Sequence, residues 1–337
     1  MSKITIRILA RQLGLSVGTV SKAFKDSHEI SAGTKKRVLD RAAELNYIPN
    51  PYASSLRKQK SKTIAVILPE IADNFFSLAI NGIQAVAAAR HYHVLIYLSH
   101  ESFEIEKQSL QHCFSGRVDG VLISVSSETK DATHIEQFKN EQVPLVFFDR
   151  DILQFAAPKV VTNDYECGRE AALHLVSRKS KHPVFLSSSE SLSICHKRNA
   201  GFTDALKELG ITSGVQHYVI DCSGDNTSIS GQLEKLLKEN PQIDGIVASV
   251  EKLAIQTYFV CQATGLKIPK DIKVVAFSTL ETASILSPSL TTISQPAFEI
   301  GRTAAEMLFD SINKKWRLET TEATITLPSL LIPRNST

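Results

Sequence analysis

Apolar residues recur at helical spacing near the start of the chain, in two short segments. One face of the first segment carries Ile8, Leu9 and Leu13, and one face of the second carries Val20, Ala23 and Phe24. Between the two segments, Gly14 suits a left-handed helix C-cap and Ser16 suits an N-cap. The pattern predicts two short helices joined by a tight turn. It fits a helix-turn-helix, and it also fits an ordinary helical hairpin.

A third helical segment begins after Ser31, with Val38, Ala42 and Leu45 along one face, and it ends before Pro49. Beyond it, Asn50 and Pro51 suit the cap and first turn of a further helix that reaches about Arg57. Two helical turns are too few to be stable alone in water. This hinge helix should therefore form only against a partner, such as DNA or a second copy of itself.

From residue 63 onward, apolar runs of strand length alternate with amphipathic helical segments. The expected strands are 63–68, 93–98, 120–125, 145–148, 184–187, 243–248 and 273–277. The expected helices are 76–90, 103–115, 131–141, 165–178, 196–209, 227–238 and 252–264. Alternation of strands and helices predicts parallel sheets covered by helices on both faces. The segment is too long for one such sheet, so an α/β core with two lobes is expected.

Charge separates the beginning of the chain from the remainder. Residues 1–62 contain 13 Lys and Arg against 4 Asp and Glu, a net charge of +9, whereas residues 63–337 contain 25 against 31, a net charge of −6. A basic segment on an acidic body is typical of a part that binds nucleic acid. A solvated basic tail is the alternative. It is disfavoured because the charges alternate with a periodic apolar pattern that should fold.

Composition and motifs argue against several other classes of protein. No apolar run reaches the roughly 20 residues of a membrane span, and the first 20 residues lack the features of a signal peptide. The five cysteines are scattered, at positions 113, 167, 195, 222 and 261, as expected in a reducing compartment. No metal-ligand spacing, phosphate-binding loop or nucleophile motif is present. We expect a cytoplasmic protein that is not an enzyme, with no cofactor, no metal and no membrane partner.

Residues 5–57 resemble the DNA-binding headpiece and hinge of the LacI/GalR family of bacterial transcription regulators. The resembling segments are Gly14–Lys22, Ile30-Ser31, Arg37–Leu39, Tyr47–Pro51 and Ala53–Arg57. The resemblance implies a small all-α helix-turn-helix head at 1–49, a hinge helix and linker at 50–62, and a two-lobed periplasmic-binding-protein-like core at 63–337. In the family this core binds the effector and forms the dimer. By analogy, the chain crosses between lobes near 161, 291 and 321, giving lobe 1 as 63–161 with 291–320 and lobe 2 as 162–290 with 321–337.

The resemblance also implies which residues read DNA. The second helix would enter the major groove, with Val17, Gly18 and Lys22 at the base edges, where Val17 can touch a thymine methyl and Lys22 can donate to guanine. Partial packing is the alternative for Val17. Phosphate contacts are expected from Thr5, Thr19 and Ser21. The complete set of expected DNA-binding residues is Thr5, Ser16, Val17, Gly18, Thr19, Ser21, Lys22, Asn50, Ala53, Leu56 and Arg57.

An effector cleft between the lobes is implied in the same way. Arg198, in the segment Arg198-Asn199-Ala200-Gly201-Phe202, stands where the family has a ligand-fixing arginine. No acidic residue is near it in the sequence, so its forked donors suit an anionic or polyhydroxyl ligand. A structural ion pair across the lobes is the alternative. The expected effector-binding residues are Phe75, Phe76, Asp149, Asn163, Arg198, Glu251, Ser278 and Gln295.

Three departures from the family pattern bear on the ligand. Val250-Glu251 stands where Asn-Asp is usual, Ser278-Thr279 where Asp-Asp or Asp-Asn is usual, and Asn163-Asp164 is inverted. Carboxylates accept two hydrogen bonds each and hold sugar hydroxyls well. Their loss makes a simple sugar less favoured. A sugar phosphate, an acidic sugar or a nucleobase-like molecule becomes a candidate, as does a cleft that has lost ligand binding.

We therefore expect a sequence-specific transcriptional regulator, of the repressor type, that binds a pseudo-palindromic operator as a homodimer. A small, carbohydrate-related effector would alter operator affinity by changing the lobe arrangement and ordering or melting the hinge helix. The sequence leaves open whether the effector induces or co-represses. A secreted uptake protein is a rival that predicts a signal peptide and no basic head. An architectural DNA protein that ignores small molecules is a second rival.

Leu56 provides a first test of this interpretation. In resembling proteins the paired hinge helices lie in the minor groove, and this leucine wedges into an easily unstacked central step such as CG. We predict that Leu56→Ala strongly weakens binding to the specific operator and leaves weak binding to bulk DNA unchanged, measured by titration of both. Equal loss of both affinities would argue against the wedge.

Overall fold

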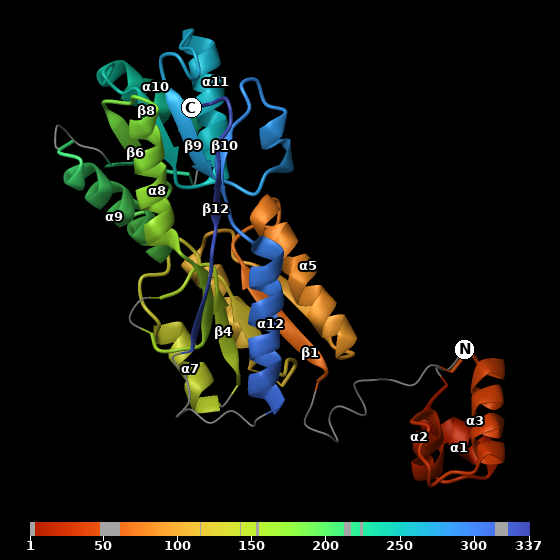
Figure 1. The fold of residues 1–337 in the computed structure, drawn as a ribbon. Coiled ribbons are helices and arrows are strands. Elements are labelled where there is room, and N and C mark those ends of the chain that lie inside the picture. The colour runs from red at the N-terminus through yellow and green to blue at the C-terminus, as the bar shows by residue number, and fades with distance from the viewer. Residues whose placement is uncertain are drawn as a thin grey trace. The chain divides into compact units, whose positions relative to one another are not determined.

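The computed structural model describes residues 4–47, 61–114, 116–141, 143–152, 155–211, 217–222, 225–313 and 323–337. The chain forms two units, divided after Ser61 (Figure 1). Each unit has a hydrophobic core of its own. The expected hinge helix, and with it Asn50, Ala53, Leu56 and Arg57, lies outside the described residues. The head and the two-lobed core are therefore described separately.

The head consists of three helices, α1 (Ile6–Leu13), α2 (Val17–Phe24) and α3 (Ala32–Glu44). Each begins at a hydroxyl N-cap, and these caps are Thr5, Ser16 and Ser31. Gly14 ends α1 with φ 66°, in the left-handed region that glycine adopts without a steric penalty. The tight turn expected from the sequence is thus present, and it sets α2 against α1.

Six buried side chains from all three helices form the core of the head: Leu9, Ala10, Val20, Ala23, Val38 and Ala42. Phe24 and Tyr47 close one side of it, with ring centroids 5.8 Å apart. Ile8 was expected in this core, but it is half-buried and Ala10 takes its place. A three-helix core shared in this way distinguishes the head from an isolated helical hairpin.

The second unit contains two six-stranded sheets, one in each lobe. In lobe 1 the strand order is β11-β5-β4-β3-β1-β2, all parallel. The strands are β1 (Thr63–Leu68), β2 (His93–Leu98), β3 (Val121–Ile123), β4 (Leu145–Phe148), β5 (Lys159–Thr162) and β11 (Thr324–Leu327). The helices are α5 (Asn74–Ala89), α6 (Phe103–Cys113), α7 (Thr133–Glu141) and α12 (Ala297–Asn313).

Lobe 2 repeats this plan with the order β12-β10-β9-β8-β6-β7, in which only β12 is antiparallel to its neighbour. The strands are β6 (Pro183–Ser187), β7 (His217–Val219), β8 (Gly245–Ala248), β9 (Lys273–Phe277), β10 (Thr291–Ser294) and β12 (Leu330–Ile332). The helices are α8 (Asp164–Ser177), α9 (Ser193–Glu208), α10 (Asn226–Glu239), α11 (Glu251–Thr264) and the 3-10 turn η1 (Glu281–Ser284).

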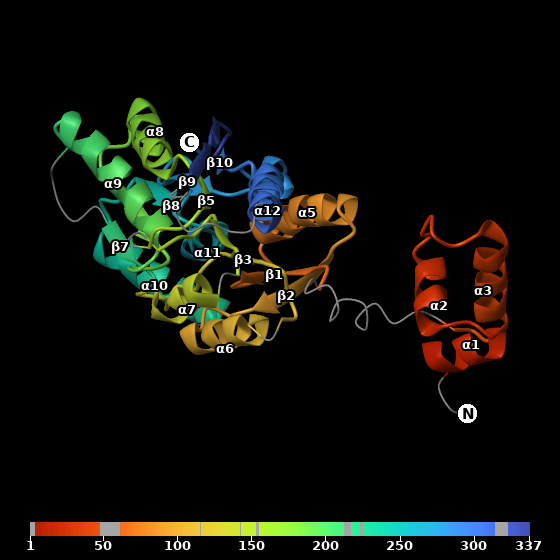
Figure 2. The same ribbon diagram turned by 90° about the horizontal axis from the view of Figure 1, so that it is seen from below.

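Each sheet is covered by helices on both faces, as the apolar strand runs predict. In lobe 1, α5 and α12 pack on one face and α6 and α7 on the other (Figure 2). In lobe 2, α8 and α9 cover the face that contains Phe185, whereas α10 and α11 cover the face that contains Val184 and Leu186. Alternate residues of one strand thus enter two different cores, which is why strands such as β1 and β6 are buried along their whole length.

The seven strands and seven helices expected between residues 63 and 277 are all present, with ends shifted by at most three residues. The short strands β5 and β7 and every element after Phe277 were not expected. A strand of three residues, such as β7, is too short to show alternation. The helix α12 had a readable signal, because Ile300, Ala304 and Leu308 repeat at helical spacing and are buried.

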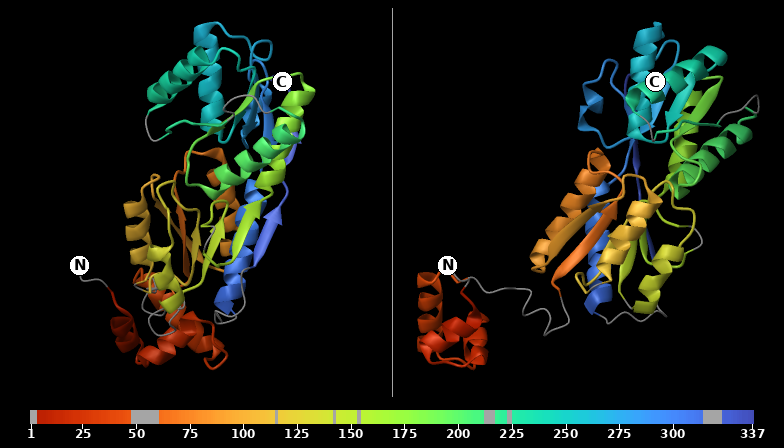
Figure 3. Two further views of the ribbon diagram at one scale, coloured as in Figure 1. Left: turned by 90° about the vertical axis from the view of Figure 1, so that its left-hand side faces the viewer. Right: turned by 180° about the vertical axis from the view of Figure 1, so that it is seen from behind.

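The chain passes between the lobes three times, and Figure 3 shows these passages from two sides. They lie at residue 163, between β5 and α8, at 295–296, between β10 and α12, and at 328–329, between β11 and β12. The expected positions were 161, 291 and 321. The second and third expectations were too early, because β10 still pairs within the lobe 2 sheet and β11 still pairs within the lobe 1 sheet.

Two helix pairs approach so closely that only glycine fits at the crossing. A Cβ atom at Gly168 of α8 would lie 1.9 Å from the carbonyl oxygen of Arg198, and one at Gly201 of α9 would lie 1.9 Å from that of Tyr165. Lobe 1 repeats the device, with Gly82 of α5 against Phe298 and Gly301 of α12 against Ala79. In each lobe, the backbones of two helices touch through one glycine on each side.

We predict that Gly201→Ala destabilises the protein by about 2 kcal/mol or more, because the obstructing atom is backbone and the helices must separate to admit a methyl group. Thermal unfolding should show a fall of several degrees in Tm. Gly231→Ala is the matched control, because this glycine lies within α10 and a methyl group there would meet no atom of another element within 4 Å. That change should leave Tm unchanged or raise it. Equal effects at both sites would contradict close helix packing.

Candidate DNA-reading surface and effector cleft

One face of α2 carries the residues that are expected to read bases. Val17 is 42% exposed, and Gly18 and Lys22 are exposed beside it, with Ser21 half-buried at the edge of the same face. The opposite face carries the buried Val20 and Ala23. Val17 therefore does not pack into the core. This face of α2 therefore offers an apolar contact through Val17 and a hydrogen-bond donor through Lys22.

Other expected DNA contacts have local roles within the head. The Thr5 hydroxyl accepts a hydrogen bond from the Ile8 amide at 3.4 Å, and the Ser16 hydroxyl accepts one from the Thr19 amide at 3.0 Å. Lys22 forms an ion pair with Glu29. An exposed pair of this kind contributes little stability, so it leaves the lysine available to exchange its partner.

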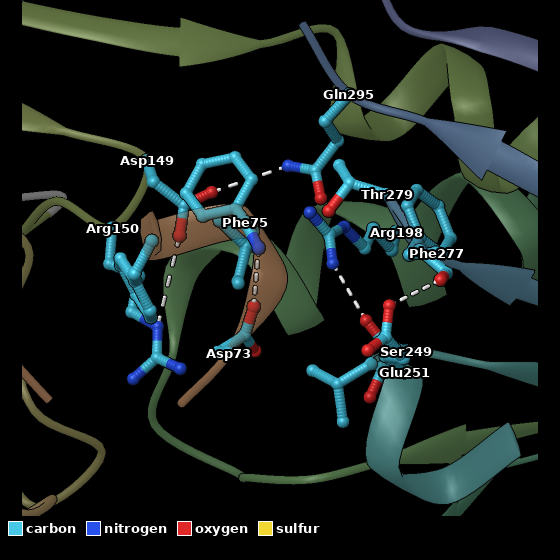
Figure 4. A pocket seen from close by; sticks show the side chains of 14 residues that line it. Asp73, Phe75, Asp149, Arg150, Arg198, Ser249, Glu251, Phe277, Thr279 and Gln295 are labelled. Atoms are coloured by element: carbon cyan, nitrogen blue, oxygen red, sulfur yellow. Dashed lines mark hydrogen bonds and ion pairs between the residues drawn. The ribbon is translucent and has the colours of Figure 1, made fainter. Parts of the chain in front are cut away.

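The second unit contains a cleft between its lobes with about 390 Å³ of empty space, including its open mouth. Fourteen residues line it: Asp73, Phe75, Phe76, Asp149, Arg150, Ile194, Arg198, Ser249, Val250, Glu251, Phe277, Ser278, Thr279 and Gln295. Most lie at strand carboxyl ends or helix N-termini (Figure 4). This is the edge at which open α/β sheets bind ligands.

Arg198 lies within α9 and is only 2% exposed. Its Nε donates to Asp164 Oδ1 at 2.7 Å, and its Nη1 donates to the Ser249 carbonyl oxygen at 2.7 Å. The guanidinium also covers the Phe277 ring, 4.0 Å from its centroid. Arg198 has no acidic residue near it in the sequence, but the α8–α9 contact brings Asp164 against it, so a structural ion pair, the alternative raised by the sequence, is present. The pair lies within lobe 2, so it does not bridge the lobes.

One buried donor atom of Arg198, Nη2, has no hydrogen-bond partner among the described residues. A buried donor without a partner costs free energy, and a ligand oxygen in the cleft would satisfy it. Arg198 is thus both a structural residue and a candidate ligand donor.

Asp149 follows β4 with φ 61°, a left-handed conformation that is uncommon for a residue other than glycine. It is 4% exposed, and its Oδ1 accepts a hydrogen bond from Gln295 Nε2 at 3.3 Å. Burial raises the pKa of its carboxyl to about 6; the charges of Asp164 and Asp73 act in the same direction, and those of Arg198 and Arg150 oppose it. A strained, buried acid of this kind is typical of a binding site.

Arg150 is oriented by Glu101, whose two carboxylate oxygens lie 2.9 and 3.0 Å from its Nη1. The guanidinium carbon stands 5.6 Å from the centroid of the Phe76 ring. The same arginine lowers the pKa of Glu101, against the opposing effect of burial. Its positive charge is therefore matched by an acid behind the cleft.

Asp73 and Glu251 face the cleft from opposite lobes. Asp73 caps α5 by accepting a hydrogen bond from the Phe75 amide at 2.8 Å, and Glu251 begins α11 and accepts one from the Ser278 hydroxyl at 2.5 Å. Burial raises the pKa of both carboxyls, and the charge of Asp73 raises that of Glu251 further. The two acids are thus close enough to repel each other across the cleft.

Hydrogen bonds join the lobes at two places. The Asn74 amide donates to the carbonyl oxygen of Thr279 at 2.6 Å. Elsewhere, Asp151 of lobe 1 accepts a hydrogen bond from the Ser193 hydroxyl of lobe 2 at 2.5 Å and lies 3.8 Å from Lys197 Nζ. Changes in these contacts would accompany any opening of the lobes.

Seven of the eight expected effector residues line this one cleft: Phe75, Phe76, Asp149, Arg198, Glu251, Ser278 and Gln295. Asn163 does not. Its Oδ1 accepts hydrogen bonds from the Ser329 amide and the Cys167 thiol, so it ties the first crossing to the third. The expectation that it contacts a ligand is not supported, because its amide oxygen is used within the crossing segments.

Seven lining residues were not expected: Asp73, Arg150, Ile194, Ser249, Val250, Phe277 and Thr279. Ser249 and Val250 follow β8, and Thr279 follows β9, so the rule that ligands bind beyond strand carboxyl ends would have found them. Asp73 could have been recognised as a helix cap next to Phe75. Ile194 has no such signal, because it reaches the cleft only through the placement of α9.

The described part of the chain offers neither a metal cluster nor a membrane span. No set of three or more His, Cys, Asp or Glu side chains there is placed to hold a metal ion. None of the helices described is long and apolar enough to cross a membrane.

Family models match both units. Residues 5–50 match the model described as bacterial regulatory proteins of the lacI family, and residues 61–333 match periplasmic binding proteins and the sugar binding domain of the LacI family. The second match alone covers most of the chain.

Curated relatives match over almost the full length. The transcriptional regulator RegA of Clostridium saccharobutylicum is 29% identical over 99% of both chains, and catabolite control protein A of Priestia megaterium is 28% identical over 99% of both. The transcriptional repressor CytR of Escherichia coli K12 is 29% identical over 91% of this chain and 89% of its own.

Solved structures share the fold. The lac repressor dimer bound to operator and the anti-inducer ONPF has a TM-score of 0.85 at 23% identity over 99% of both chains. The complex of the transcriptional regulator CelR with cellobiose has a TM-score of 0.73, also at 23% identity, over 99% of this chain and 100% of that one. The matches to both units establish that this chain belongs to the LacI family: it is a DNA-binding transcriptional regulator and not an enzyme.

Proposed function

We propose that the chain is a repressor that binds a pseudo-palindromic operator as a homodimer, with α2 of each head in the major groove. Val17, Gly18 and Lys22 would contact the bases, because they share the face of α2 that does not pack into the head. The exposure of Val17 is the observation that carries this proposal. This apolar side chain lies at the first residue of α2, on the same exposed face as Gly18 and Lys22, where it can meet a thymine methyl.

The remaining expected DNA contacts complete this proposal. Thr5, Thr19 and Ser21 would bind phosphate groups and fix the position of the head, with Ser16 beside them at the start of α2. Asn50, Ala53, Leu56 and Arg57 would act in the minor groove. The head would comprise 1–49, the hinge and linker 50–62, and the core 63–337. We place the protein in the cytoplasm, where bacterial DNA lies and where its free thiols would stay reduced.

We further propose that a small effector binds in the cleft between the lobes. Among the similar structures, CelR is in complex with cellobiose and the lac repressor is bound to an anti-inducer. In this chain, Phe75, Phe76, Asp149, Arg198, Glu251, Ser278 and Gln295 would form the site. A ligand held by both lobes would favour one lobe arrangement, change the spacing of the two linkers in the dimer, and so form or melt the hinge helices.

Selection of bound DNA from a random pool by the full-length protein tests the regulator proposal. We predict an enriched palindrome that binds at least about a thousandfold more tightly than bulk DNA at physiological salt. Lys22→Ala should relax the preference at one base pair in each half-site, by about tenfold. Lys36→Ala, an exposed lysine of α3, is the control and should weaken all sequences alike.

A different outcome would favour the architectural alternative. A protein that binds phosphates alone would enrich no sequence, and its affinity would fall steeply as salt rises. In that case, Lys22→Ala and Lys36→Ala would have the same effect.

Asp149 provides a test of the proposed effector site through stability. A folded-state pKa of about 6, above the ordinary 3.8, means that ionisation of Asp149 opposes folding, so its stability cost appears as pH rises from about 4 to above 6. A shift of this size corresponds to about 3 kcal/mol. Asp149→Asn removes the charge, and asparagine tolerates the left-handed backbone.

We therefore predict that Asp149→Asn raises Tm by several degrees at pH 7.5 and by clearly less at pH 4.5, where only part of the cost has appeared. Asp310→Asn, an exposed position of α12, should change Tm at neither pH. If the variant is more stable but no longer binds the effector, the carboxylate of Asp149 serves ligand binding at the expense of stability. A loss of stability at pH 7.5 would contradict this role.

A further inference from the structure

The cleft contains more negative charge than its own cations match. Its lining includes three carboxylates, Asp73, Asp149 and Glu251, and two guanidinium groups. Each guanidinium is already paired with an acid that does not line the cleft: Arg150 with Glu101 and Arg198 with Asp164. Once these two pairs are set aside, Asp73 and Glu251 have no cation among the described residues, and Asp149 keeps only a long contact of 3.9 Å with Arg150 Nε.

Helix N-termini offset only part of this charge. Asp73 caps α5 and Glu251 begins α11, and a helix N-terminus supplies roughly half of a positive charge. In the described part of the chain, no ion pair includes either residue. Asp149 has Arg150 Nε only at 3.9 Å, and that arginine is oriented toward Glu101. A surplus of negative charge therefore remains in a largely buried space.

A second, independent feature indicates an oxygen-bearing ligand. Arg198 is 2% exposed, and its buried Nη2 has no hydrogen-bond partner among the described groups. This arginine belongs to the lining of the same cleft as the carboxylates. A hydroxyl or carbonyl oxygen of a bound molecule would accept its hydrogen bond.

The aromatic lining fits such a molecule as well. Figure 4 shows the Phe75 ring amid Asp73, Asp149 and Arg198. A ring face attracts a cation and also packs against the apolar face of a sugar ring. Arg198 covers the Phe277 ring, and Arg150 stands 5.6 Å from the centroid of the Phe76 ring. Of the three lining phenylalanines, Phe75 is therefore the one for which no contact with a guanidinium is described.

We infer that the effector is a small hydroxylated amine, of the chemical type of an amino sugar, whose ammonium group lies between Asp73 and Glu251 and whose hydroxyl oxygen accepts a hydrogen bond from Arg198. This inference rests on the effector site proposed above and specifies its ligand. The ammonium group would join the two lobes, because Asp73 belongs to lobe 1 and Glu251 to lobe 2. Binding would thereby favour one lobe arrangement.

The alternatives raised by the sequence fit this charge distribution less well. A sugar phosphate or an acidic sugar would bring a further negative charge to three carboxylates, while both arginines are already paired. A neutral sugar would accept and donate hydrogen bonds but leave the carboxylates uncompensated. An ammonium group attracts all three carboxylates at once.

Isothermal titration calorimetry with the full-length protein tests the inference directly. The probes are glucosamine, galactosamine and mannosamine, each compared with its parent hexose and its N-acetyl derivative. At pH 7.5 we expect at least one amine to bind at least tenfold more tightly than both of its neutral counterparts. Binding of that amine should release protons at pH 6, detected in buffers of different ionisation enthalpy, because the ammonium group favours the ionised carboxylates.

Two variants connect this preference to the proposed residues. Asp73→Asn keeps a helix cap, and Glu251→Gln keeps the side-chain shape. Each should reduce the ratio of amine affinity to parent-sugar affinity by about tenfold, because the lost charge matters more to the ammonium group than to a neutral hydroxyl. Glu281→Gln removes an exposed charge of η1 outside the cleft and should leave the ratio unchanged.

The outcomes separate this inference from the proposed function. If a parent hexose binds as tightly as its amine, the effector site stands and the ammonium inference is wrong. If no amino sugar binds with a Kd below about 1 mM, the inference is wrong as well. The regulator proposal is unaffected by either result, because the selection of operator DNA uses no ligand.

Discussion

The buried pair of Arg198 and Asp164 depends on one geometric constraint, the contact of the α8 and α9 backbones through Gly168 and Gly201. Asp164 lies one turn before Gly168, so the crossing that seats the glycine also brings the carboxylate 2.7 Å from the guanidinium. A buried arginine without such a partner would cost several kcal/mol. The pair holds Arg198 against Ser249 and Phe277, at the wall of the cleft. The position of Arg198 in the cleft therefore depends on the packing of α8 against α9.

A second close contact of two helices through glycines supports the opposite wall of the cleft, in lobe 1. In lobe 1, Gly82 and Gly301 bring α5 and α12 together, and α12 arrives there from lobe 2 through the crossing at Gln295. Gln295 in turn donates to Asp149 at the end of β4. In each lobe, a pair of touching helices thus lies near a buried charged residue of the cleft. This residue is Arg198 in lobe 2 and Asp149 in lobe 1. Movement of the lobes would change the distance between two rigid walls and leave each wall intact.

Charge gives this cleft its chemical character. Both arginines are neutralised from behind, by Glu101 and Asp164, and three carboxylates face inward. Asp73 belongs to lobe 1 and Glu251 to lobe 2, so the repulsion between them falls when the lobes separate. A cation bound between them would remove this repulsion when the lobes close. A ligand that supplies this cation would stabilise the arrangement that the empty cleft disfavours. The proposed control of DNA binding then follows from electrostatics between lobes.

The sequence by itself determined most elements up to Phe277 and much of the cleft, and the tertiary structure decided how the charges of the cleft are paired. Local signals sufficed for the caps of the head, for the strands buried on both faces, and for residues at strand ends such as Asp149 and Ser278. Asp164 lies 34 positions before Arg198, and Glu101 lies 49 before Arg150, so no local pattern revealed these pairs. The position of Asn163 in a crossing was equally hidden. Ion pairing and burial depend on distances between segments remote in the chain, and only the packing of helices onto sheets sets those distances.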